Sequence, residues 1–160
     1  MSRRRTAYLL IVVLLPSVSL AQTKLSGVSQ CGKPDIQHVV PVGDQPGHAF
    51  AVVKLRCPWV KPLQVGGVAA KEDEITVFQE VTGTKAAERI FVVGTMANGD
   101  SVFVRTEGTA VVKDGVVQSS RGKWTYVGGT GKFKGLTGTG TYKNDGSTTK
   151  VEGEYKLAKR

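Results

Sequence analysis

Residues 124–142 read WTYVGGTGKFKGLTGTGTY, a stretch dominated by glycine, threonine and aromatic residues. The pair Gly131-Lys132 suggests a phosphate-binding loop, but that motif requires a glycine five positions earlier and a serine or threonine after the lysine. Tyr126 and Phe133 stand at those two positions. The residues that follow are poor helix formers, so we expect no helix N-terminus that could bind a phosphate. The stretch therefore predicts no nucleotide site.

The glycines of this stretch are instead typical of a small β-barrel. Gly138, Gly140 and Tyr142 are spaced two residues apart, so in a strand they share one face. Alternating small and large residues on an inward face allow a tapered barrel to close. By the same reasoning, we expect a corner or bulge between two strands at three further glycines: Gly128, Gly129 and Gly131.

β-strand patterns continue along the rest of the chain. Residues 49–57 and 89–96 are rich in apolar and β-branched residues, and hydrophobic and polar residues alternate over 74–81. Glycine-containing turn signals separate the runs, and Asn98-Gly99 is the strongest of them. No segment has the apolar face of an amphipathic helix. About eight such runs predict an all-β fold: a closed antiparallel β-barrel of about eight strands with mostly meander connections.

The N-terminus has the three parts of a secretory signal peptide. Residues 3–5 are arginines, residues 7–15 form an apolar run too short to span a bilayer, and residues 19–21 (SLA) form a small-x-small cleavage site. We therefore expect residues 1–21 to be removed and no membrane span to remain in the mature chain. The short, arginine-led signal is typical of bacteria, so the expected location is the periplasm or the medium.

The mature chain has the length of one domain. Residues 22–48 are interpreted as an N-terminal arm, polar and mobile as far as Cys31, followed by a first strand. Residues 49–160 are interpreted as the barrel domain. Within it, Pro58 and Pro62 are interpreted as turn residues that end a strand.

Charge gives little information about partners. The formal net charge is +9 at pH 7, and it falls to +6 when the three arginines of the signal peptide leave. A basic chain can adhere to nucleic acids or anionic surfaces. The lysines are scattered here, and no arginine-rich block or nucleic-acid-binding motif is present. We expect a solvated basic surface and no nucleic-acid partner.

Cys31 and Cys57 are the two cysteines. In an oxidising compartment a pair usually forms a disulfide, which here would tie the arm to the end of the strand over 49–57. The alternative is a catalytic thiol, which would need a base, and His38 and His48 are the available histidines. We predict the structural disulfide. Neither histidine has a cysteine or carboxylate at metal-ligand spacing, so we expect no metal and no other cofactor.

Four segments carry a family resemblance: CPWVKP (57–62), GTMANGDSVFVRTEGTA (94–110), WTYVGGTGKFKGLTGTGTY (124–142) and VEGEYKL (151–157). They resemble bacterial secreted proteins of the allene oxide cyclase barrel-like group, which are related in fold to plant allene oxide cyclases and dirigent proteins. The resemblance implies an eight-stranded antiparallel barrel with an interior cavity. It implies no activity, and no position here matches the catalytic carboxylates of the plant enzymes, so no catalytic residue is assigned.

Candidate ligand-binding residues come from three strands. Arg105 and Glu107 share one strand face. Facing the interior, they would anchor a carboxylate or hydroxyl of a ligand, and facing solvent they would form an ordinary surface pair. The opposite face of that strand is more uniformly apolar, which favours the surface interpretation. Trp124, Tyr126 and Tyr155 would either line a cavity and stack on a flat ligand or fill the core, which is the commoner role.

Three functions are open at this point. The leading prediction is a secreted β-barrel protein that binds a small, largely apolar molecule. The alternatives are an isomerase or cyclase acting on an oxidised lipid or phenolic substrate, and a structural envelope protein. A cavity with a buried charged group among aromatic residues would favour binding or catalysis, whereas a solidly packed interior would favour the structural role.

Overall fold

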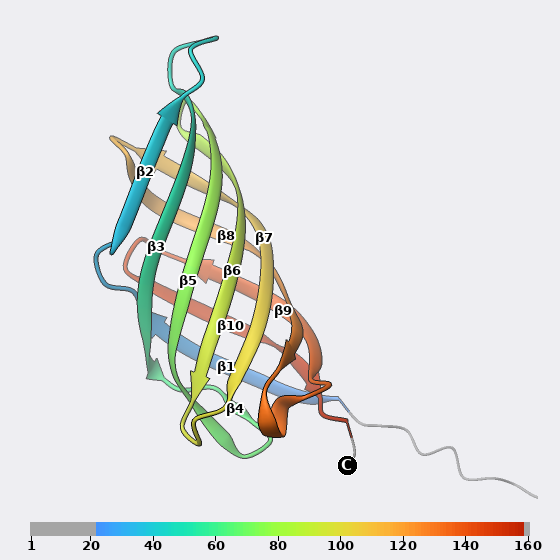
Figure 1. The fold of residues 1–160 in the computed structure, drawn as a ribbon. Coiled ribbons are helices and arrows are strands. Elements are labelled where there is room, and N and C mark those ends of the chain that lie inside the picture. Colours follow the sequence, from blue (N-terminus) through green and yellow to red (C-terminus); the bar gives the residue numbers. More distant parts are fainter. Residues whose placement is uncertain (1–21, 159–160) are drawn as a thin grey trace, which may run out of the picture.

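The computed structural model describes residues 22–158, so the predicted signal peptide lies outside the described residues. Strands dominate this part of the chain (Figure 1), and its one helix is a three-residue 3-10 turn, η1. No helix within 22–158 is therefore long and apolar enough to cross a membrane. The elements are β1 (Thr23–Gln30), β2 (Ile36–Pro41), β3 (His48–Lys61), β4 (Gln64–Val65), β5 (Val68–Thr82), β6 (Lys85–Met96), β7 (Ser101–Lys113), β8 (Val116–Gly129), η1 (Gly131–Phe133), β9 (Thr137–Asn144) and β10 (Thr148–Lys156).

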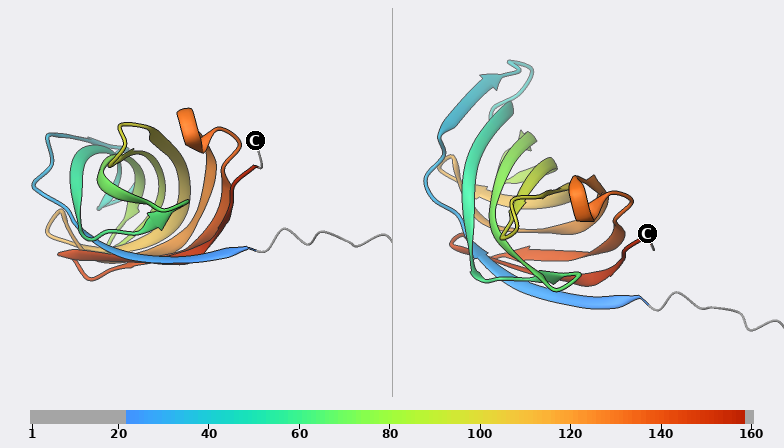
Figure 2. Two further views of the ribbon diagram at one scale, coloured as in Figure 1. Left: turned by 90° about the horizontal axis from the view of Figure 1, so that it is seen from below. Right: turned by 60° about the horizontal axis from the view of Figure 1, so that its bottom comes forward.

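Eight of the strands form a closed ring with antiparallel neighbours throughout (Figure 2). The order around the ring is β1, β10, β9, β8, β7, β6, β5 and β3, and the pairing of β3 with β1 completes it. Strands β5 to β10 follow one another around the ring, which is meander connectivity. The predicted all-β fold with about eight antiparallel strands is therefore confirmed. The two remaining strands lie outside the ring, β2 paired with β3 and β4 paired with β5.

The N-terminal segment forms a strand of the ring, where a mobile arm was expected. β1 pairs with β10 along its whole length. Its inward residues Leu25, Gly27 and Ser29 are buried. Two of these three residues are small, so the sequence shows little of the hydrophobic alternation by which the other strands were recognised.

β3 also extends further than its prolines predicted. It runs through Pro58 and ends at Lys61, just before Pro62. Pro58 is the last residue of β3 that pairs with β5, and Trp59 is the first that pairs with β1. Because the neighbouring strand changes here, the missing N–H of Pro58 falls at the end of a hydrogen-bonded ladder.

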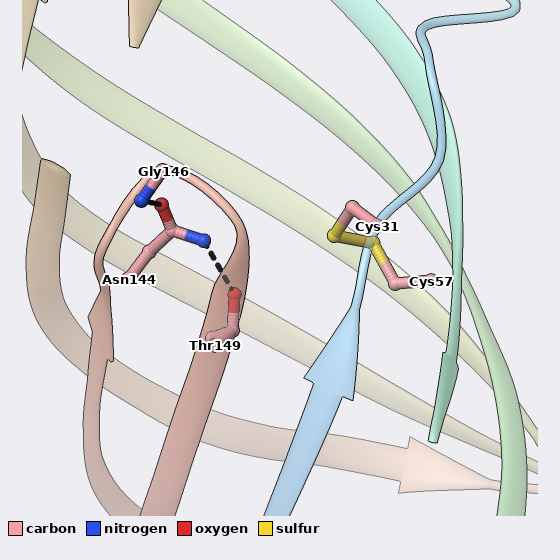
Figure 3. The surroundings of a disulfide bond; sticks show 5 residues. All are labelled: Cys31, Cys57, Asn144, Gly146 and Thr149. Carbon is pink, nitrogen blue, oxygen red and sulfur yellow. Dashed lines mark hydrogen bonds between the residues drawn. A yellow bond between two sulfur atoms is a disulfide. The ribbon is translucent and has the colours of Figure 1, made fainter. Parts of the chain in front are cut away.

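The pairing between β1 and β3 is the shortest in the ring. Two residue pairs join these strands, whereas β3 pairs with β5 over the whole of 48–58. A disulfide between Cys31 and Cys57 crosses the same seam (Figure 3), and it confirms the predicted bond. The disulfide therefore reinforces the ring where backbone pairing contributes least.

The ring has two unlike ends. One end, called the hairpin end, carries the turns that join β5 to β6, β7 to β8 and β9 to β10. The opposite end, called the plug end, carries β4, η1 and the loops beside them (Figure 1). Large side chains with almost no exposed surface fill the plug end: Val65, Met96, Phe133 and Leu136.

Gly128, Gly129 and Gly131 lie where the chain turns between β8 and β9. β8 ends at Gly129 and η1 begins at Gly131. The φ angles of Gly128 and Gly131 are 135° and 46°, which L residues rarely adopt. A Cβ on Gly129 would lie 2.5 Å from the carbonyl oxygen of Ser101. These glycines shape a tight turn at the plug end, and a helix as short as η1 provides no phosphate site.

Candidate functional site

A cavity of about 790 Å³ lies inside the ring. This volume falls within the range of about 300–1,000 Å³ that is usual for small-molecule sites. Most of its walls come from the inward faces of β3 and of β5 to β8. Apolar side chains dominate these walls, among them Val53, Leu55, Ile75, Val77, Ile90 and Val104.

The cavity extends to the turns of the hairpin end and to the β1–β2 side, where Pro34, Gln37 and Val39 line it, and it is closed at the plug end. Turn residues line it at the hairpin end, including Gly47, Thr84, Gly115 and Gly146. At the other end it reaches Leu63 and Ala70, beyond which the buried side chains of the plug begin. A molecule inside would therefore have its inner end enclosed by protein and its outer end near solvent.

Hydrogen bonds order the rim of the cavity beside the disulfide. Cys31 lies next to the β9–β10 turn (Figure 3). In that turn the side-chain oxygen of Asn144 accepts a 2.7 Å hydrogen bond from the Gly146 N–H. The amide nitrogen of Asn144 donates a 2.9 Å hydrogen bond to Oγ1 of Thr149. Covalent and polar contacts thus fix this side of the opening.

Asp73 places a carboxyl group on the cavity wall toward the plug end. It comes from β5, in phase with Ile75 and Val77. The residue of β6 that pairs with Asp73 is Gly94, and a Cβ at that position would lie 2.8 Å from Oδ1 of Asp73. The absence of a side chain at Gly94 therefore makes the space that the carboxyl group occupies.

The environment of Asp73 raises the pKa of its carboxyl group. Burial raises the pKa of Asp73 to about 7, the nearby Trp59 N–H opposes this rise, and the charge of Glu72 adds to it. Asp73 keeps some accessible surface because it faces the cavity, yet protein surrounds it on the other sides. It forms no ion pair with any residue of 22–158. Near neutral pH the group therefore populates both the acid and the carboxylate form.

Two buried polar atoms in the cavity wall lack a hydrogen-bond partner among the described residues. They are Nε1 of Trp59 and Oγ1 of Thr106. The Trp59 N–H lies close enough to Asp73 to favour its charged form, but no hydrogen bond forms between them. A buried polar group without a partner costs about 1–3 kcal/mol. Polar groups on a bound molecule would remove that cost.

Glu88, by contrast, is a buried carboxyl group with its own donors. Its Oε1 accepts a 2.5 Å hydrogen bond from the Tyr142 hydroxyl. Its Oε2 accepts a 3.1 Å hydrogen bond from Nε2 of Gln79. Burial, followed by the hydrogen bond to Glu88 and its charge, raises the pKa of Tyr142. The tyrosine therefore stays protonated and remains a donor.

Register explains how Tyr142 on β9 reaches Glu88 on β6. Gly108 on β7 and Gly122 on β8 lie directly between them in one row across the four strands. A Cβ on Gly108 would collide with the Tyr142 hydroxyl, and a Cβ on Gly122 would collide with the carbonyl of Glu107. Two adjacent glycines therefore let the tyrosine side chain lie across two strands.

The predicted aromatic residues lie on the inner side of the ring. Trp124 and Tyr126 line the cavity, with ring centroids 5.0 Å apart in an edge-to-face arrangement. Burial raises the pKa of Tyr126, and the charge of Asp73 contributes to the rise. Tyr155 is buried in the core next to the plug, where its hydroxyl accepts a 2.8 Å hydrogen bond from the Gly66 N–H. Ligand binding by these three side chains stays a prediction.

Arg105 and Glu107 lie on the outer face of β7, which agrees with the favoured surface interpretation and not with the alternative of interior anchors. Both side chains are exposed and neither lines the cavity. The guanidinium of Arg105 lies 5.4 Å from the centre of the Phe91 ring on the outside of β6. The inward face of β7 is the apolar one, and Thr106 is the one residue with a polar side chain on it.

Sequence reasoning did not find three of the polar residues that line the cavity: Asp73, Gln79 and Glu88. A usable signal was present. Asp73 and Gln79 are in phase with the apolar residues of β5, and Glu88 is in phase with Ile90 of β6. A polar residue in the apolar phase of a strand is a candidate interior group. The histidines, cysteines and carboxylates of 22–158 form no group of three or more that could hold a metal ion.

The fold and the cavity define the class of protein: an all-β chain whose strands close around an internal ligand-sized space. No protein-family model and no curated protein matches the sequence. Among solved structures, a conserved protein of unknown function from Rhodopseudomonas palustris is 7% identical, covers 86% of this chain and 99% of its own, and has a TM-score of 0.49. A pyocyanin demethylase is 14% identical, covers 82% of this chain and 98% of its own, and has a TM-score of 0.44. The resemblance to the allene oxide cyclase barrel-like group stays a prediction.

Proposed function

We propose that this protein binds a small, largely apolar molecule inside its ring of strands. The cavity of about 790 Å³ is the observation that supports the proposal most strongly. Small-molecule sites are mostly apolar and carry a few placed polar groups, as this one does. A structural envelope protein would gain stability from a solidly packed interior and has no use for such a space.

The shape of the site favours an elongated molecule. Asp73 and Gln79 both face the cavity and are six residues apart on β5. Six residues of a strand span about 20 Å. Apolar side chains line the wall between them, including Ile75 and Val77. A molecule with an apolar body and polar groups near its inner end and its middle fits this arrangement.

Native mass spectrometry of the protein purified from its source provides the first test. We expect a mass above that of the mature chain, and the excess should be released by denaturation. Recovery of the bare chain alone, together with failure to take up any apolar probe, would contradict the proposal.

A fluorescent probe provides the second test. The neutral dye N-phenylnaphthylamine should bind saturably, with one molecule per chain. Ala51 faces the cavity and is buried, whereas Val52 is the next residue of β3 and faces outward. Ala51→Phe should fill part of the space and weaken dye binding, and the matched control Val52→Phe should leave it unchanged. Equal binding by both variants would place the dye outside the cavity.

We also propose that the mature protein acts outside the cytoplasm. The signal-peptide pattern of residues 1–21 supports this proposal, and the Cys31–Cys57 disulfide is compatible with it. N-terminal sequencing of protein recovered from the envelope or medium should begin after Ala21. A sequence that begins at Met1 would contradict export by cleavage.

One observation favours a second function, isomerisation or cyclisation of the bound molecule. The pKa of Asp73 is raised to about 7, and such a carboxyl group can both accept and donate a proton near neutral pH. Ligand recovered from the native protein should then change its chromatographic retention, at unchanged mass, when it is incubated with fresh protein. Unchanged retention would leave binding as the function.

A further inference from the structure

Charge is distributed unequally between the surface of the molecule and its cavity. The mature chain is basic, with lysines and arginines along its outer faces. The interior wall carries Asp73 and Glu88 instead. Among the described residues that line the cavity, Lys113 is the one basic side chain, and it lies at the rim as the last residue of β7. The protein thus encloses carboxyl groups away from its own cations.

The carboxyl groups of Glu88 and Asp73 differ in their hydrogen-bond and ion-pair partners. Glu88 accepts hydrogen bonds from Tyr142 and Gln79, so both of its oxygens have donors. Asp73 has no ion pair within 22–158, and the neighbouring Trp59 N–H favours the carboxylate but falls short of hydrogen-bond geometry. Asp73 is therefore the interior carboxyl group that lacks a cationic partner. The hydroxyl of Thr106 is a second buried polar position on the wall, close to the Tyr142 side chain.

We propose that the cavity selects apolar molecules that carry a protonated amine, and that Asp73 is the group that recognises the amine. This inference rests on the proposed binding function and specifies the class of ligand. Water is largely excluded from the inner end, where an ammonium group would make a charge-assisted hydrogen bond with the carboxylate. Trp59 and Tyr126 line the same part of the cavity, and aromatic rings also attract cations. A fatty acid would bring a like charge to Asp73 and Glu88.

The surroundings of Asp73 set the expected pH dependence. On its own strand, Glu72 is the charged neighbour, and β8 contributes Tyr126. The residues of β3, β6 and β7 that pack nearest carry no titratable group: Trp59, Gly94 and Val102. Since the pKa of Asp73 is about 7 in the empty cavity, amine binding should strengthen as the pH rises through 7 and the carboxylate forms. Binding of an uncharged analogue should not change.

Three probes with one ring system test the inference: naphthylethylamine, naphthylethanol and naphthylacetic acid. Calorimetric titration at pH 8 should show the amine binding at least about ten-fold tighter than the acid, with the alcohol between them. In Asp73→Asn the advantage of the amine over the alcohol should fall to within about two-fold, while alcohol binding is retained. The matched control is Glu74→Gln, because Glu74 is the next residue of β5, faces outward and pairs with Lys54 at 2.8 Å.

The outcomes separate the inference from the proposed function. If the alcohol binds but the amine has no advantage, or keeps its advantage in Asp73→Asn, the inference is wrong and the binding function stands. If none of the three probes and no neutral dye binds, the proposed function is wrong and the inference fails with it. Should Asp73→Asn not fold, the wild-type protein decides the matter. Amine affinity that does not rise between about pH 5.5 and 8.5, relative to the alcohol, would overturn the role of Asp73.

Discussion

The hydroxyl of Tyr142 donates a 2.5 Å hydrogen bond to Oε1 of Glu88, across 54 residues of sequence and the two intervening strands β7 and β8. The contact ties β9 to β6 through the interior, beyond what backbone pairing provides. It also gives a buried carboxyl group one of its two donors. Stability and the shape of the cavity therefore depend on the same pair of side chains.

Removal of that hydroxyl should destabilise the protein. Tyr142→Phe leaves one oxygen of Glu88 without a donor, and hydrogen bonds to charged groups contribute about 1.5–3 kcal/mol. We expect a loss of this size in urea unfolding. Tyr126→Phe is the control, because the Tyr126 hydroxyl makes no hydrogen bond among the described residues although the side chain is equally buried. Equal losses in the two variants would mean that the Tyr142 hydroxyl contributes nothing specific.

A side chain at Gly108 should be tolerated poorly. The added Cβ of Gly108→Ala would collide with the Tyr142 hydroxyl and with the backbone carbonyl of Arg121, which cannot move without disturbing β8. Overpacking of this kind costs about 1–3 kcal/mol or more. Gly32→Ala is the matched control, since the nearest atom to its added Cβ lies 3.8 Å away. Thermal unfolding should separate the two variants, and similar melting temperatures would show that the row of glycines is not required.

Stability should respond to pH through Asp73. Its pKa is about 7 in the folded protein and 3.8 in the unfolded chain, so the folded state binds more protons between these values. Stability from this group is therefore full below about pH 4 and is lost progressively up to about pH 7, by at most about 4 kcal/mol. Asp73→Asn should be the more stable protein above pH 7, and the difference should shrink toward pH 4.

Glu74, a neighbouring carboxylate, should show the opposite pH dependence of stability and therefore serves as the control. Lys54 lowers the pKa of the exposed Glu74, so the contribution of Glu74 is present at neutral pH and lost on acidification. Glu74→Gln should therefore lose a little stability at neutral pH, where Asp73→Asn gains. If urea unfolding at several pH values showed no pH-dependent difference between Asp73→Asn and wild type, burial would not control this carboxyl group.

The disulfide should matter most at the seam that it crosses. The double variant Cys31→Ser, Cys57→Ser should lose about 3.5 kcal/mol, the loop-entropy value for a closure of 26 residues. Hydrogen exchange should accelerate first in β1 and in the end of β3 that pairs with it, because two residue pairs remain there. Uniform acceleration around the whole ring would indicate that the bond stabilises the protein globally and not this seam.

Most of the strands could be predicted because the patterns that identify them lie within short stretches of sequence. Alternation identified β5, apolar and β-branched runs identified β3 and β6, and Asn98-Gly99 identified the turn before β7. β1 could not be found in this way, since Gly27 and Ser29 are inward residues without a hydrophobic signal. The extent of β3 beyond Pro58 depends on a change of neighbouring strand, which is a property of the assembled ring.

The site was less accessible to sequence reasoning, for two physical reasons. Asp73 stands within the run KEDE, and charged residues in such a run usually face solvent. Its inward direction follows only from its phase with Ile75 and Val77. Glu88 is satisfied by Tyr142, and this contact requires the register of four strands. The aromatic residues Trp124 and Tyr126 were found because aromatic side chains on a common strand face are buried in most proteins.

The closed plug end gives the cavity a direction. Gly115 and Gly146 line the cavity at the hairpin end and Asp73 lies toward the plug end, so a guest that enters past these turns reaches Asp73 with its leading end. The trailing end of such a guest would lie beside the turns of the rim. The inner half of the cavity would then determine which head groups are accepted, and a guest joined through its trailing end to a larger molecule would still present its head group to Asp73.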